Sequence, residues 1–122
     1  MIEKLRMDHI NKIDENFVLQ GWPSRNEILK QYLIEQEKGE RLVLVDSEND
    51  ETRGYITLVY RPDSGAFKDT GIPEIVDFNV FERFQKRSIG QGLLDAVIFE
   101  AGKTGSYVGI GVGLNSNYGK AQ

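Results

Sequence analysis

A strand, a glycine-containing turn, a helix and a second strand follow one another between residues 74 and 114, and this order constrains the fold more than any other feature of the chain. Glu74 to Val80 is rich in the β-branched and aromatic residues that strands favour, and Tyr107 to Leu114 predicts the second strand. Residues 89–103 carry one apolar stripe at helical spacing, formed by Leu93, Leu94, Val97, Ile98 and Ala101. Two strands joined through a helix lie parallel in one sheet, with a right-handed crossover. The sheet is therefore expected to contain a parallel pair.

A β-hairpin is predicted in the middle of the chain. Residues 41–46 include Leu42 to Val45, a continuous apolar run typical of a strand that is covered on both faces. A polar turn at residues 47–52 follows, and Gly54 to Tyr60 is the second strand. Because a short turn joins strands antiparallel, most of the sheet is expected to be antiparallel.

Two helices are predicted before the hairpin. Residues 8–19 carry apolar side chains at helical spacing. Ser24 and Glu27 have the form of a capping box, which predicts a second helix that ends near Gly39. The expected apolar face of this helix consists of Ile28, Leu29, Tyr32 and Leu33. His9 is the only histidine, and without a partner in the sequence we expect it at the surface.

With a short first strand at residues 2–7, these elements predict one domain of the α/β (α+β) class over residues 1–122. Its centre is a mixed, mostly antiparallel sheet with helices on both faces. A net charge of −4 argues against a nucleic-acid partner. The absence of cysteine excludes a thiolate metal site, and we expect no metal. No apolar run approaches the roughly 20 residues that span a membrane, so we expect a cytoplasmic protein without a membrane partner.

The turn at residues 85–92 carries the strongest functional signal. Lys86 and Arg87 supply positive charge, while Gly90 and Gly92 let the backbone approach an anion closely. The first N–H groups of a helix have no intrahelical partner, and the helix dipole adds partial positive charge there. The sequence therefore predicts a phosphate-binding turn, although an ordinary strand-to-helix turn would also show a glycine pair.

This turn resembles the signature of the GNAT-type N-acetyltransferases, Q/R-x-x-G-x-G/A, which lies between the fourth strand and the third helix of that family. Residues 87–92 fit the pattern letter for letter, and residues 85–90 fit it with Ser88 in place of the first glycine. We prefer the second register, because it aligns Leu93 and Leu94 with the family's usual aliphatic pair. The resemblance covers nearly the whole chain, but it is specific only over residues 77–94.

The resemblance implies that acetyl-CoA is the co-substrate and that its acetyl group is transferred to a primary amine of a small molecule or peptide. The pantetheine arm would pair with the edge of the strand that ends at Val80, like an added strand. The pyrophosphate would bind the backbone amides of the turn. The implied cofactor-binding residues are Phe78, Asn79, Val80, Gln85, Lys86, Arg87, Ser88, Ile89, Gly90, Gln91 and Gly92, with Asn115 and Tyr118 nearby.

Glu74 is the candidate general base. An attacking ammonium must lose a proton, and a carboxylate can take it directly or through water. Some members of the resembled family keep a glutamate at this place. In an ideal strand Glu74 shares a face with Val76 and Phe78, while Asp77 points the other way as a structural hydrogen-bonding residue. The alternative role of Glu74 is that of a solvated residue at the strand entrance.

The end of the chain departs from the resembled family, whose members usually continue for two more strands and a full fourth helix. That helix often carries a tyrosine that protonates the leaving thiolate, and Tyr118 lies too early for this role. The sequence therefore predicts a C-terminally shortened domain, in which a homodimer would cover the open strand edge. The alternative functions are a CoA-binding regulatory or interaction module without turnover and a fragment that binds no CoA.

Overall fold

A computed structural model of the chain describes residues 1–49, 51–62, 68–81, 84, 88–103, 105 and 107–110. The helices and strands follow one another in the order that the sequence predicts. In chain order the elements are β1 (Ile2–Lys4), α1 (Met7–Leu19), α2 (Asn26–Glu37), β2 (Arg41–Glu48), β3 (Glu51–Val59), β4 (Glu74–Val80), α3 (Ile89–Ala101) and β5 (Gly109–Ile110).

The strands form one mixed sheet in the order β1-β2-β3-β4-β5. The first three pairings are antiparallel, and β4 pairs with β5 in parallel through Glu74 with Gly109 and Ile75 with Ile110. Helix α3 connects this parallel pair, as the crossover requires. The predicted mixed, mostly antiparallel α+β sheet is therefore confirmed. Of the last predicted strand, residues 111–114 lie outside the described part of the chain.

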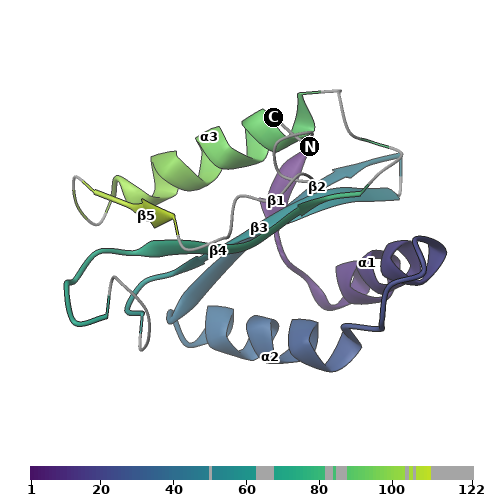
Figure 1. Cartoon of the computed structure of the whole chain (residues 1–122), viewed down its shortest axis with the longest axis horizontal. Helices are drawn as coiled ribbons and strands as arrows, with labels where there is room; N and C mark the ends of the chain where they lie inside the picture. Colours follow the sequence, from purple (N-terminus) through teal and green to yellow (C-terminus); the bar gives the residue numbers. More distant parts are fainter. Residues whose placement is uncertain are drawn as a thin grey trace.

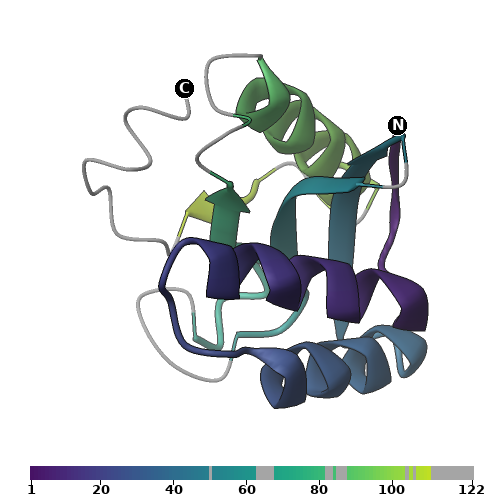
Figure 2. The same ribbon diagram turned by 90° about the vertical axis from the view of Figure 1, so that its right-hand side faces the viewer.

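The helices cover both faces of the sheet (Figures 1 and 2). Helix α3 packs on one face against β2, β3 and β4, while α1 packs against β3 and α2 against β2 on the other. The run from Leu42 to Val45 is buried along its whole length, as expected for a strand between two helical layers. Burial of apolar side chains on both faces supplies the main driving force for this arrangement.

Two expectations about the helices are wrong. Helix α2 begins at Asn26, and the Ser24 hydroxyl donates instead to the carboxylate of Asp14 on α1 at 2.9 Å. The predicted capping box does not form, because the residue directly before the helix is Arg25 and Ser24 lies one position too early. The Ser24 hydroxyl accepts only a long hydrogen bond of 3.4 Å, from the N–H of Asn26. On the same helix, Leu29 is buried but Ile28 is 44% exposed.

His9 is also placed differently from the expectation, because it is buried. Its Nδ1 accepts a hydrogen bond from the backbone N–H of Arg6 at 2.9 Å, and its Nε2 lies 3.0 Å from a carboxylate oxygen of Glu3. Burial lowers the pKa of His9, and the positive charge of Arg6 lowers it further. Glu3 lies in β1, and Arg6 directly precedes α1.

Strand β4 contains a β-bulge that the sequence pattern did not predict. Val76 lies opposite Thr57 and Asn79 lies opposite Tyr55, so two residues of β4 share the single position opposite Ile56. Asp77, one of the two, has φ of 47°, in the left-handed region that non-glycine residues rarely adopt. The bulge therefore interrupts the regular alternation of side chains along β4.

The bulge corrects the expected faces of β4. Glu74 and Val76 face the α1–α2 layer, because they line a pocket together with residues at the end of α2. Asp77 does not point to the opposite side, since its carboxylate contacts side chains of the same layer. Asn79 lies on the same face, where its amide contacts the hydroxyl of Tyr55. Alternation from Asn79 then places Phe78 on the opposite face.

Candidate functional site

The predicted phosphate-binding turn leads into the first turn of α3. Ser88, immediately before the helix, has φ of 60° and ψ of 16°, a left-handed conformation. Ile89 and Gly90 follow in helical conformation and are buried, whereas Ser88 and Gln91 are exposed. A left-handed residue next to helical ones turns successive backbone N–H groups toward one concave face, which is the geometry of an anion nest.

The start of α3 lacks the usual neutralising groups among the residues that the structure describes. The side chain of Ser88 makes no capping hydrogen bond, and residues 89–92 of the first turn include no acidic side chain. The N–H of Gly92 donates to the carbonyl of Ser88 at 3.1 Å. The amide of Gln91 is held by Asp95 at 2.8 Å and points along the helix surface. An anion would therefore meet the partial positive charge of the helix start, and the first turn at residues 89–92 supplies no competing carboxylate.

Ser88 also bears on the register of the motif. In the preferred register this serine replaces a glycine of the resembled pattern, and its backbone here has the left-handed conformation that glycine adopts most readily. The geometry therefore supports that register. Gln85, Lys86 and Arg87 of the motif lie outside the described residues, as do Asn115 and Tyr118.

The other predicted residues line up along β4. Glu74 lies at the beginning of the strand and Val80 at its end, so the two are at most about 20 Å apart, the span of a regular strand without the bulge. Val80 leads toward the start of α3, and Phe78 and Val80 are buried. Glu74 and the phosphate-binding turn are therefore at opposite ends of one strand and not in one cluster.

A pocket of about 1090 Å³ opens beside Glu74, between α2 and the adjoining ends of β3 and β4. Val59 and Val76 line it together with charged residues of both signs. Among the described residues these are the carboxylates of Glu35, Glu40 and Glu74 and the cations of Lys38, Arg41 and Arg61. Glu35 is engaged by Arg41 at 2.7 Å, whereas the half-buried carboxylate of Glu74 has no hydrogen bond or ion pair in the described part of the chain.

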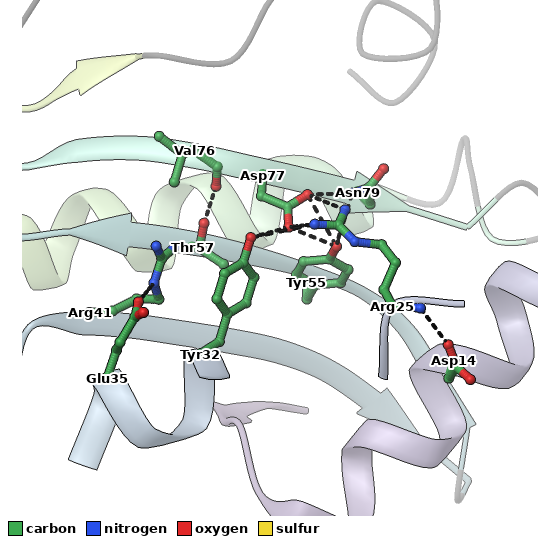
Figure 3. A network of polar contacts seen from close by, with 10 residues as sticks. All are labelled: Asp14, Arg25, Tyr32, Glu35, Arg41, Tyr55, Thr57, Val76, Asp77 and Asn79. Atoms are coloured by element: carbon green, nitrogen blue, oxygen red, sulfur yellow. Dashed lines mark hydrogen bonds and ion pairs between the residues drawn. The ribbon is translucent and has the colours of Figure 1, made fainter. Parts of the chain in front are cut away.

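A polar cluster surrounds the bulge on the α1–α2 side of the sheet (Figure 3). Asp77 is its centre, and its carboxylate accepts hydrogen bonds from the side chains of four residues. The donors are Arg25 through Nη1 at 3.0 Å, Tyr32 at 2.8 Å, Tyr55 at 3.1 Å and Asn79 at 3.0 Å. The Nη2 of Arg25 also forms an ion pair with the carboxylate at 2.8 Å. We call these five residues the Asp77 cluster.

The electrostatics of the Asp77 cluster keep its tyrosines protonated. Burial raises the pKa of Tyr32 to about 12, and the negative charge of Asp77 adds to the shift. Burial likewise raises the pKa of Tyr55, again helped by Asp77. Burial opposes the charge of Arg25, but its neighbours Tyr55 and Asp77 leave its pKa raised. The two phenols are therefore hydrogen-bond donors to Asp77 throughout the neutral range.

The cluster continues toward the pocket through α2. The guanidinium of Arg41 stacks 4.1 Å from the ring centroid of Tyr32, and Arg41 also bonds Glu35 one helical turn further on. A structural hydrogen-bonding role of Asp77 was expected from the sequence, but its partners were not. The only signal was a carboxylate inside a mostly apolar strand, because Arg25 and Tyr32 lie far away in the sequence.

Within the described residues, no group of three or more histidine, aspartate or glutamate side chains is arranged to hold a metal ion. No helix in that part of the chain is long and apolar enough to cross a membrane.

Comparisons with known proteins agree with this architecture. The sequence model of the acetyltransferase (GNAT) family matches residues 7–119, while no curated protein matches the chain. An N-acetyltransferase from Staphylococcus aureus Mu50 is 18% identical, with a TM-score of 0.72 over 95% of this chain and 73% of its own. Glucosamine-6-phosphate N-acetyltransferase from Arabidopsis thaliana is 15% identical, with a TM-score of 0.70 over 95% of this chain and 82% of its own. A predicted acetyltransferase from Clostridium acetobutylicum, solved with acetyl-CoA, is 15% identical, with a TM-score of 0.68 over 95% of this chain and 81% of its own. At these identities the likeness shows a shared fold.

Proposed function

This chain belongs to the acetyltransferase (GNAT) family, and we propose that it transfers an acetyl group from acetyl-CoA to a primary amine by direct attack of the amine on the thioester. The observation that carries the proposal is the left-handed Ser88 before an uncapped α3. The diphosphate of CoA would bind the backbone N–H groups of this turn, where the helix dipole favours negative charge.

The direction of β4 supports the placement of the rest of the cofactor. The strand runs from the pocket to the phosphate-binding turn, so an arm that starts at the turn and follows the strand backward leads toward Glu74. The pantetheine arm carries two amides, which suit pairing with a strand at Phe78 to Val80. The thioester would then lie along the middle of β4, between the phosphate-binding turn and the pocket.

The pocket beside Glu74 is the proposed entrance of the amine. The amine nitrogen forms a bond to the carbonyl carbon, the carbon–sulfur bond breaks, and CoA leaves as its thiolate. Before the attack, one proton of the ammonium passes to Glu74, directly or through water. A second proton leaves the nitrogen as the amide forms and neutralises the thiolate. Two features support this role of Glu74: its carboxylate has no partner in the described part of the chain, and it lines the pocket.

Two measurements test the proposal. Calorimetric titration with CoA and acetyl-CoA tests binding, and Gly90→Val in the first turn of α3 should weaken both ligands at least tenfold by blocking the close approach. Gly105→Val is the matched control, because a Cβ there meets nothing within 4 Å. Since Gly90 is buried, each variant's unfolding is measured alongside. The absence of heat at millimolar CoA would contradict the proposal.

Release of the CoA thiol over a panel of amines tests transfer. Glu74→Gln keeps the shape of the side chain but cannot accept the proton, so kcat should fall about a hundredfold or more while KM changes little. Glu37→Gln, an exposed carboxylate at the end of α2 outside the pocket, should leave kcat unchanged. A chain that binds CoA but acetylates no amine would be a CoA-binding module without turnover.

A further inference from the structure

The bulge in β4 is held by side chains and not by the backbone alone. Asp77 has a left-handed backbone that is unfavourable for any residue with a Cβ, and such strain persists only where the surroundings fix it. Here the surroundings are the Asp77 cluster, whose donors reach both carboxylate oxygens (Figure 3). Arg25 binds through both terminal nitrogens, which also fixes the plane of the carboxylate.

The Asp77 cluster is largely shielded from solvent, so separating its charged groups would cost free energy. The side chain of Asp77 is 14% exposed and that of Arg25 is 25% exposed. A buried ion pair gains little net stability, because both charges lose water, but it penalises any arrangement that separates them. Regular pairing of β4, without the bulge, would leave the Asp77 carboxylate on the apolar face toward α3. The cluster therefore selects the bulged pairing over the regular one.

Arg25 reaches Asp77 from a fixed position. Its backbone N–H donates to the Asp14 carboxylate at 2.8 Å, so the connection between α1 and α2 is tied to α1. Its guanidinium also lies 5.6 Å from the ring centroid of Phe17. The α1–α2 layer thus holds β4 at one residue, directly before the segment 78–80.

We propose that Asp77, held by Arg25, Tyr32 and Tyr55, is a positioning residue that fixes the bulge and thereby the course of the segment 78–80 along which the pantetheine arm binds. The inference rests on the proposed function for the identity of that ligand. Without the bulge the pairing moves by one residue, which exchanges the faces of Phe78, Asn79 and Val80. Binding of the arm should then be lost while the phosphate-binding turn at α3 is unaffected.

The test separates these two parts of the ligand. Acetyl-CoA contains the arm, and 3′-phosphoadenosine 5′-diphosphate contains the phosphates without it. Asp77→Asn should weaken acetyl-CoA about tenfold, the equivalent of one hydrogen bond, and should change the affinity for the shorter ligand less than twofold. Amide hydrogen exchange in segment 76–80 should become at least tenfold faster, because the bulge opens more often.

Asp46→Asn is the matched control. Asp46 pairs with Arg53 at 2.7 Å with similar burial, 8% and 20% exposed, on β2 and β3, and neither residue belongs to the Asp77 cluster. Asp46→Asn should lower the free energy of unfolding. It should change neither the ratio of the affinities for acetyl-CoA and 3′-phosphoadenosine 5′-diphosphate nor the rate of amide hydrogen exchange in segment 76–80. The proposal would be overturned if Asp77→Asn and Asp46→Asn had equal effects on this ratio of affinities and on the exchange rate.

Two further variants keep the test decisive. Tyr32→Phe removes a single donor and serves if Asp77→Asn fails to fold, with a smaller change in the same direction. Asp77→Gly permits the left-handed backbone but has no carboxylate, so wild-type behaviour of this variant would refute a role of the cluster. If the wild-type chain binds neither ligand, the proposed function is overturned, and the exchange comparison still decides whether Asp77 holds the bulge.

Discussion

Gly54 on β3 is the position where one added methyl group should do most damage. It lies opposite Val80, next to the β4 segment proposed to bind the pantetheine arm. A Cβ on Gly54 would lie 2.7 Å from the carbonyl oxygen of Asn79 and 3.1 Å from the Cα of Val80. Both are backbone atoms and cannot rotate away, so β3 and β4 must separate. The third neighbour, Leu93, is a side chain at 3.3 Å that can adjust.

The expected magnitude follows from these contacts. Overpacking of a well-packed interior costs about 1–3 kcal/mol, and replacing glycine by alanine in a strand returns roughly 0.5–1 kcal/mol through backbone entropy. Gly54→Ala should therefore lower the free energy of unfolding by about 1–2 kcal/mol. Urea denaturation followed by circular dichroism measures this change. CoA affinity should fall as well, because the displaced atoms belong to the binding segment.

Gly105→Ala is the control, since a Cβ there has open space and the backbone is not left-handed. Its free energy of unfolding should stay within about 0.5 kcal/mol of the wild type. If Gly54→Ala were as stable as Gly105→Ala, the close approach of β3 and β4 described here would be wrong.

Two other predictions concern His9 in α1 and Ser88 before α3. Because burial depresses the pKa of His9 in the folded state below its unfolded value of about 6.5, stability should be complete above pH 6.5 and fall as the pH drops toward the folded pKa. His9→Asn, which can still accept from the Arg6 N–H, should remove this part of the pH dependence in urea titrations at pH 5 and 7; an unchanged slope would show that other groups cause it. Ser88→Gly relieves a left-handed non-glycine backbone and should raise the free energy of unfolding by up to about 1 kcal/mol. The same variant should bind CoA at least as well as the wild type, and a loss of affinity measured by calorimetry would mean that the serine hydroxyl contacts the ligand.

The sequence was a good guide wherever local pattern decides structure. The apolar run from Leu42 to Val45 identified a strand with both faces covered, and the whole run is buried. The predicted bounds of β4, from Glu74 to Val80, agree with the structure. The predicted helix at residues 89–103 is α3, with Leu93, Val97 and Ala101 on its buried face. Ile98, also expected in the apolar stripe, is instead 43% exposed. These features follow from periodicities of two and 3.6 residues, which each segment carries alone.

Sequence reasoning failed where a polar side chain has a choice of partners. The Ser24 hydroxyl was expected to bond the start of α2, but its short hydrogen bond is to Asp14, which only the packing of α1 beside α2 brings within 2.9 Å. His9 was expected to be solvated, but β1 and the start of α1 enclose it between Arg6 and Glu3. The partners of Ser24 and His9 cannot be predicted from sequence spacing, because they depend on which residues the fold brings together.

In the candidate site, too, local sequence determined some features and the tertiary structure determined the others. Length, hydrophobic pattern and the glycine-containing turn determined the order of the elements, the crossover through α3 and the place where an anion could bind, since each is a local property of the chain. Only the tertiary structure decided which way the residues of β4 point. The bulge depends on pairing with β3 and on Arg25 and Tyr32, which are 52 and 45 residues away from Asp77. A strand's side-chain faces are set by its register with a neighbour, and register is a property of the assembled sheet.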